Sequence, residues 1–153
     1  LVGDQRIESP FLRNQYNHQN LSTADAIFLS FSIEAWGPLP EVALNCRDNR
    51  IGDGGVAAIS GVLTSLPELR CLSLGRVGLG DAGMHILATS LSEGSIPRLE
   101  ELWLDENTIG DSSIKSFASS ARALPEMRTL ALHGNDLGDE ACTALADALM
   151  ADA

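Results

Sequence analysis

One tripeptide, Ile/Leu-Gly-Asp, occurs four times in this chain of 153 residues. The copies begin at Ile51, Leu79, Ile109 and Leu137, so their spacings are 28, 30 and 28 residues. Self-similarity at a period of this length is the signature of repeat architectures. Each unit of such a protein buries its apolar side against the next unit, so the period constrains the fold more than local propensity does.

Two patterns flank every copy of the tripeptide. A short stretch with alternating apolar residues, such as Leu102 and Leu104, comes before it, and alternation of this kind indicates a half-buried strand. A segment with helical apolar spacing, such as Ile114 and Phe117, comes after it. An asparagine lies two residues before the Ile/Leu in three copies, and Val77 takes its place in the other. These asparagines are Asn49, Asn107 and Asn135.

This arrangement resembles the leucine-rich repeat L-x-x-L-x-L-x-x-N-x-L. The length of 28 residues, the Gly-Asp pair and the full helix resemble the ribonuclease-inhibitor-like, intracellular subfamily. The resemblance implies an α/β solenoid, a segment of a right-handed βα horseshoe with parallel strands on the concave side and helices on the convex side. Four repeats are predicted, at about 41–68, 69–98, 99–126 and 127–153. Residues 1–40 are interpreted as a degenerate N-terminal repeat or as a capping or extended segment.

The repeated polar residues have expected structural roles. An asparagine side chain has two donors and an acceptor, so it can satisfy backbone groups that lack sheet partners in the turn after each strand. Val77 interrupts this series, which predicts that the second repeat is the weakest. The glycine supplies a tight bend. The four aspartates are expected to be N-caps or first-turn charges of the helices, and they are Asp53, Asp81, Asp111 and Asp139.

Composition excludes several classes of protein. The formal net charge is −11, from 10 Lys+Arg against 21 Asp+Glu, which disfavours binding to nucleic acid or anionic membranes. No apolar run is long enough to span a bilayer. Three cysteines favour a reducing compartment over a disulfide framework. The chain begins with Leu1, so we expect a processed or truncated piece of an intracellular protein, either cytoplasmic or inside a plastid or mitochondrion after transit-peptide removal.

No motif in the sequence predicts an enzyme, a metal site or a cofactor. Residues 78–83 spell G-x-G-x-x-G, but the repeat register already accounts for Gly80 and Asp81, and a carboxylate lies where a pyrophosphate would bind. The histidines His18, His85 and His133 have no spacing suited to zinc, and no Ser/His/Asp or Cys/His set is visible.

The strand face opposite the helices is the predicted partner-binding surface. Trp103 lies in the middle of it with four acidic neighbours. Tryptophan and arginine are enriched at interface hot spots, so Trp103 is either a partner anchor or a residue that packs only on its neighbours. The surface is expected to contain Asn45, Arg47, Asp48, Arg70, Cys71, Ser73, Arg76, Glu100, Glu101, Trp103, Asp105, Glu106, Arg128, Thr129, Ala131 and His133.

The predicted function is that of a non-enzymatic protein–protein interaction module, a scaffold or accessory subunit of a larger assembly. The expected partner is a protein, and the acidic rim suits one with a basic surface. The last helix is not followed by a polar cap, so we expect a longer solenoid or a neighbour that covers this edge. Two alternatives stay open: a small-GTPase regulator similar to the Ran GTPase-activating protein, and a ligand-sensing domain of an innate-immunity-type receptor.

Overall fold

The computed structural model describes residues 16, 18–36, 43–94 and 96–150 of the chain. Strands and helices alternate along it, and two short 3-10 turns follow α2 and α4. In chain order the elements are α1 (Thr23–Trp36), β1 (Ala43–Asn45), α2 (Gly52–Gly61), η1 (Leu63–Ser65), β2 (Cys71–Ser73), α3 (Asp81–Ser92), β3 (Glu101–Trp103), α4 (Asp111–Ser120), η2 (Ala121–Ala123), β4 (Thr129–Ala131) and α5 (Asp139–Met150).

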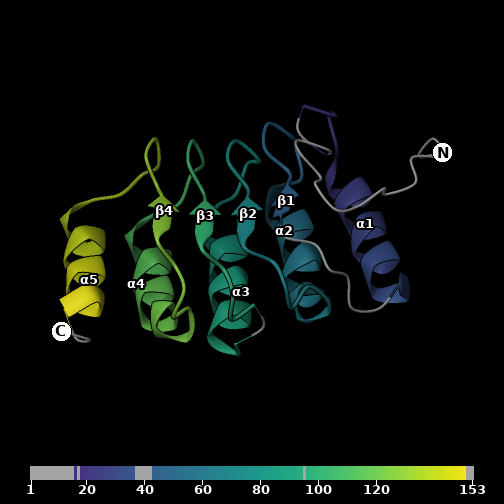
Figure 1. The fold of residues 1–153 in the computed structure, drawn as a ribbon. Coiled ribbons are helices and arrows are strands. Elements are labelled where there is room, and N and C mark those ends of the chain that lie inside the picture. The colour runs from purple at the N-terminus through teal and green to yellow at the C-terminus, as the bar shows by residue number, and fades with distance from the viewer. Residues whose placement is uncertain (1–15, 17, 37–42, 95, 151–153) are drawn as a thin grey trace.

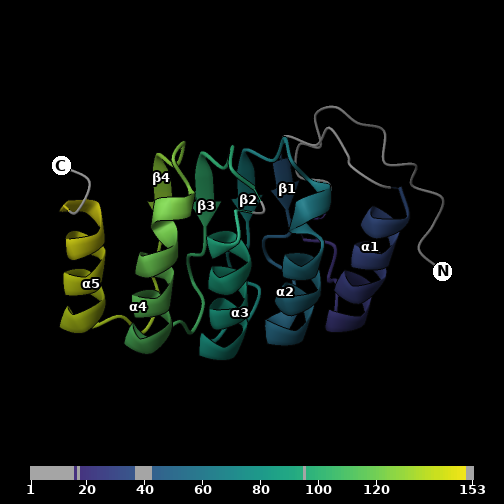
Figure 2. The ribbon, with the colours of Figure 1, turned by 90° about the horizontal axis from the view of Figure 1, so that it is seen from below.

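The strands form a parallel four-stranded sheet in the order β1-β2-β3-β4. Leu44, Leu72, Leu102 and Leu130 stand opposite one another in register. The helices stand side by side in one layer from α1 to α5, with the sheet along one side of that layer (Figures 1 and 2). The prediction of an α/β repeat solenoid with parallel strands is therefore confirmed.

The core lies between the sheet and the helices and runs through successive repeats. Leu72 and Leu74 of the second repeat are completely buried, as are Leu102 and Leu104 of the third. On the helix side, Met84 and Phe117 are also completely buried. The alternating apolar residues of the strands and the helically spaced apolar residues of the helices are thus buried in the same layer. Because this layer continues from one repeat to the next, each unit depends on its neighbours to bury its apolar side.

The first described helix, α1, extends this layer at the N-terminal end. Ser22 forms a parallel bridge with Arg50, and Ala26, Leu29 and Ile33 are buried members of the common core. The expected division at residue 40 lies outside the described residues, so the division stays a prediction. The opposite side of α1 exposes Phe28 (59%) and Phe31 (63%).

The asparagines bond backbone groups of their own repeat and of the repeat before it. The Oδ1 atom of Asn107 accepts the N–H groups of Val77 (3.1 Å) and Leu79 (3.0 Å). Its Nδ2 atom donates to the carbonyls of Leu74 (2.8 Å) and Leu104 (2.9 Å). Asn49 and Asn135 make corresponding bonds, to Leu21 N and Ile109 N respectively. The backbone N–H of Val77 is therefore satisfied by the asparagine of the following repeat.

Of the two roles expected for the aspartates of the tripeptide, N-cap or first-turn charge, the structure shows the second. Each lies in the first turn of its helix, but the helices show no side-chain capping bond. Instead, three carboxylates accept the glycine N–H of the next repeat: Asp53 from Gly80 (2.6 Å), Asp81 from Gly110 (2.7 Å) and Asp111 from Gly138 (2.6 Å). We call Asp53, Asp81 and Asp111 the bridging aspartates. They are therefore first-turn charges and not N-caps, and their side-chain bonds join two repeats.

The C-terminal end of the sheet is less well covered than its centre. Leu130 and Leu132 are only partly buried, whereas their counterparts Leu102 and Leu104 are completely buried. Asp139, at the position of the bridging aspartates, has an exposed side chain. The last described repeat therefore presents an incompletely covered edge.

Candidate protein-binding face

Two rows of side chains lie on the side of the sheet that faces away from the helices. Because alternate strand residues point to opposite faces, the residues on either side of the buried leucines form this surface. We call it the open sheet face. One row is Ala43, Cys71, Glu101 and Thr129, and the other is Asn45, Ser73, Trp103 and Ala131, both in register across the sheet.

Trp103 is partly buried and lies between two small neighbours. Ser73 stands opposite it on β2 and Ala131 stands opposite it on β4. The indole Nε1 donates a hydrogen bond to Oε2 of Glu101 (3.1 Å), two residues earlier on the same strand. This bond orients the ring relative to the strand, and its register neighbours on β2 and β4 are both small. The sequence placed Trp103 on this face, and the structure locates it there.

Salt bridges border the open sheet face on the side where the strands begin. Glu100 pairs with Arg70 of the previous repeat and lies 3.9 Å from Nη1 of Arg128 in the following repeat. Arg70 and Arg128 are exposed, so this row stays in contact with solvent. Exposed pairs of this kind stabilise a protein little, by about 1 kcal/mol or less each.

A more deeply buried ion pair borders the side where the strands end. The guanidinium Nη1 of Arg47 donates to Oδ1 of Asp105 at 2.7 Å, across a separation of 58 residues. Asp105 is only 1% exposed. This corrects the expectation that Asp105 is an accessible partner-binding residue, because its carboxylate is enclosed by Arg47 and its own loop. His133 Nε2 lies 3.6 Å from the other oxygen of the same carboxylate.

The loops after β1, β2 and β3, together with His18, contribute a row of charged residues at one position of the repeat. His18, Asp48, Arg76 and Glu106 all have positive φ, from 54° to 58°, in the region that favours glycine. Their charges alternate: His18 lies 3.3 Å from Asp48, Asp48 lies 3.6 Å from Arg76, and Arg76 lies 3.9 Å from Glu106. The sequence pattern placed Asp48, Arg76 and Glu106 on the predicted surface but missed His18, which its spacing of 30 residues from Asp48 could have indicated.

The three cysteines are free thiols in different surroundings. Cys46 is buried in the core, and burial raises the pKa of its thiol to about 12. Cys71 is half-buried on the open sheet face, and burial, together with the nearby Glu101 carboxylate, raises the pKa of its thiol to about 11. Cys142 is exposed on α5. Neither Cys46 nor Cys71 is activated, since both thiols hold their proton at neutral pH.

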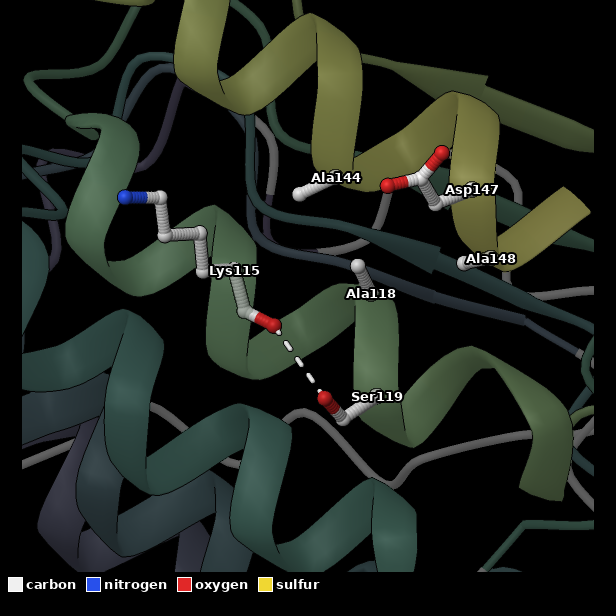
Figure 3. A pocket seen from close by; sticks show the side chains of 6 residues that line it. All are labelled: Lys115, Ala118, Ser119, Ala144, Asp147 and Ala148. Carbon is white, nitrogen blue, oxygen red and sulfur yellow. Dashed lines mark hydrogen bonds between the residues drawn. The ribbon is translucent and has the colours of Figure 1, made fainter.

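A shallow hollow lies between α4 and α5. Lys115, Ala118 and Ser119 line it from α4, and Ala144, Asp147 and Ala148 line it from α5 (Figure 3). Ser119 Oγ donates to the carbonyl of Lys115 (3.3 Å), and the Lys115 ammonium pairs with Glu140. These side chains form no nucleophile–base pair, so the hollow is not a candidate active site. Within the described part of the chain, no group of His, Cys, Asp and Glu residues could hold a metal ion.

Comparison with known proteins now identifies the repeat. The family model for the leucine-rich repeat matches residues 42–60 and 125–146. The chain is 35% identical to the ribonuclease inhibitor of Sus scrofa over 106 residues, which is 69% of this chain and 21% of that protein. The chain is a leucine-rich-repeat protein of the ribonuclease-inhibitor-like type.

Two further similarities extend this result. The Tonsoku-like protein of Bos taurus is 38% identical over 96 residues, covering 62% of this leucine-rich-repeat chain and 7% of the relative. A solved structure titled "Leiomodin-1 Actin-Binding Site 2 (ABS2)" has the same fold, with a TM-score of 0.67 and 16% identity over 82% of this chain and 70% of that one. The chain thus spans only about a fifth of the length of the ribonuclease inhibitor and less than a tenth of the length of the Tonsoku-like protein. None of the described helices is long and apolar enough to cross a membrane.

Proposed function

We propose that this leucine-rich-repeat chain is a protein-interaction module that binds its partner with the open sheet face, as a scaffold or accessory subunit of a larger assembly. The observation that carries the proposal is Trp103, which is held by Glu101 between the small residues Ser73 and Ala131. A partly exposed aromatic group that is held in place beside small side chains is suited to anchor a protein interface.

The rim of the open sheet face supports the proposal in a second way. Its arginines and carboxylates are ordered by one another, through Arg47–Asp105 on one side and Arg70–Glu100 on the other. A preordered rim loses less conformational entropy when it binds than a mobile one does. The overall charge of −11 favours encounter with a partner that has a basic surface. This function requires neither a catalytic group nor a cofactor.

Three free cysteines fit an intracellular, reducing compartment, which we propose as the location of the module. Residues 1–15 lie outside the described part of the chain and have no role in the proposal.

Affinity purification from the native source, followed by mass spectrometry, tests the proposal. The protein is compared with Trp103→Ala and with a matched aromatic change, Phe28→Ala, on the exposed side of α1. We expect at least a fivefold loss of one specific co-purifying protein with Trp103→Ala and no loss with Phe28→Ala. Equal recovery with both variants, each shown to be folded by circular dichroism, contradicts binding by the open sheet face.

A further inference from the structure

We propose that Trp103 and Glu101 together form a receptor site for one arginine side chain of the partner, whose guanidinium stacks on the indole and pairs with the carboxylate. This inference rests on the proposed function and makes the chemistry of its anchor specific. It commits to a single type of occupant, an arginine carried by a partner polypeptide.

The first argument is the pairing of charges around the open sheet face. Glu100 pairs with Arg70, and Asp105 pairs with Arg47. Asp48 and Glu106 both lie within reach of Arg76, at 3.6 Å and 3.9 Å. Among the described residues, Glu101 is the carboxylate of this face that has no cation within 4.0 Å. The face therefore offers one negative charge for a partner to neutralise.

The second argument is that Glu101 is held in position before any partner arrives. Its Oε2 atom accepts the hydrogen bond from Trp103 Nε1 (3.1 Å), and Cys71 stands opposite Glu101 in register on β2. A neutral donor orients the carboxylate without neutralising its charge, so the carboxylate stays available to a cationic donor. A charge-assisted hydrogen bond from a cation is about twice as strong as a neutral one.

The third argument concerns the shape of the site. The Glu101 carboxylate lies at the Nε1 edge of the indole, and the small side chains of Ser73 and Ala131 flank the ring. A planar cation can therefore lie on the ring face and still reach the carboxylate at its edge. Guanidinium stacks on aromatic rings and donates in a fixed fork, whereas an ammonium is a compact, strongly hydrated charge. The site thus favours arginine over lysine.

The test uses defined peptides, because the partner is not identified. We would titrate the intact chain with an acetylated and amidated Gly-Gly-Arg-Gly-Gly peptide and with the same peptide carrying lysine or citrulline in place of arginine. Citrulline has the shape of arginine without its charge. The readout is the ¹⁵N–¹H signal of the Trp103 indole, which a Trp36→Phe variant separates from the other tryptophan of the chain.

We expect a saturable shift with the arginine peptide and a dissociation constant about tenfold lower than that of the citrulline peptide. A cation–π contact and an exposed ion pair together account for a difference of this size. Lysine should fall between the two. Glu101→Gln should remove most of this preference, and Glu34→Gln, an equal change of charge on the exposed side of α1, should not. Equal affinity for arginine and citrulline, or an unchanged preference in Glu101→Gln, overturns the inference.

The two proposals fail in different ways. If native co-purification depends on Trp103 while the peptides show no preference for arginine, the binding face stands and the arginine site is wrong. If the peptides show the preference while co-purification ignores Trp103, the receptor site stands and the proposed use of the face is wrong.

Discussion

Arg47 and Asp105 lie 58 residues apart in the sequence and form a salt bridge of 2.7 Å across the intervening second repeat. The contact passes over Gly75. A Cβ atom at that position would lie 2.3 Å from Nη1 of Arg47 and 2.8 Å from Oδ1 of Asp105. The absence of a side chain at Gly75 is therefore what allows the first and third repeats to meet.

Gly75→Ala tests this relationship. The methyl group would force the guanidinium and the carboxylate apart and leave Asp105 buried with a weakened partner, so we expect unfolding to become easier by about 2 kcal/mol. Urea denaturation measures this free energy. The matched control is Gly61→Ala at the end of α2, where an added Cβ meets nothing within 4 Å. We expect it to be neutral or stabilising, and equal effects of the two substitutions would argue against the proposed role of Gly75.

The bridging aspartates allow a second comparison. Asp81 accepts from Gly110 N and from Ser113 Oγ (2.6 Å), whereas Asp139 occupies the same repeat position in the last repeat with an exposed side chain. Both residues lie in the first turn of a helix, so alanine removes the same favourable helix-dipole interaction from each. We expect Asp81→Ala to be more destabilising than Asp139→Ala by about 1 kcal/mol, the worth of the inter-repeat bonds. Equal losses in thermal or urea unfolding would show that the dipole accounts for the whole effect.

The same aspartate predicts a dependence on pH. Hydrogen bonds from Ser113 and Gly110 lower the pKa of Asp81 below its usual 3.8. Because the folded-state pKa is the lower one, this stabilisation is fully present above about pH 3.8 and is lost as the pH falls through the folded value. We expect Asp81→Asn to unfold with a shallower loss of stability below pH 4 than the unchanged chain. Parallel stability curves for the two proteins in that range would contradict the assignment.

Much of the fold could be predicted because the same sequence pattern recurs in each repeat. The alternation around Leu102 and the helical spacing around Phe117 recur at a fixed period, and a parallel strand order follows once such units stack. The position of Trp103 on the open sheet face follows from the same alternation. These inferences use short-range patterns, which the sequence displays directly.

Other features could not be predicted, because they depend on contacts between repeats. From sequence alone, an aspartate at the start of a helix is expected to cap that helix or to interact with its dipole. Only the bonds from the glycine N–H groups of the following repeats show that Asp53, Asp81 and Asp111 join repeats. The burial of Asp105 depends on an arginine two repeats earlier. The acidic environment expected around Trp103 is largely neutralised by arginines from other repeats, and this changes which carboxylate is available to a partner.

Asn107 provides a fourth prediction. Its amide accepts two backbone N–H groups and donates to carbonyls of two repeats, and the residue is 7% exposed. Asn107→Ala leaves several buried backbone groups unsatisfied, so we expect a loss of about 3 kcal/mol in the free energy of unfolding. Asn135→Ala should cost less, since Asn135 is only partly buried in the less covered last repeat. A smaller effect at Asn107 than at Asn135 would contradict this order.

The last prediction concerns the reactivity of the cysteines. Because the thiolate is the reactive species, a raised pKa and burial both slow alkylation. At pH 8 we expect iodoacetamide to modify exposed Cys142 first, Cys71 at least about tenfold more slowly and Cys46 only on unfolding, since the pKa values of Cys71 and Cys46 are raised to about 11 and about 12. Glu101→Gln removes the negative charge beside Cys71 and should therefore speed its modification, while the rate at Cys142 stays the same. Mass spectrometry of timed samples measures each rate, and modification of Cys71 as fast as Cys142 would show that its thiol is neither shielded nor held in the protonated form.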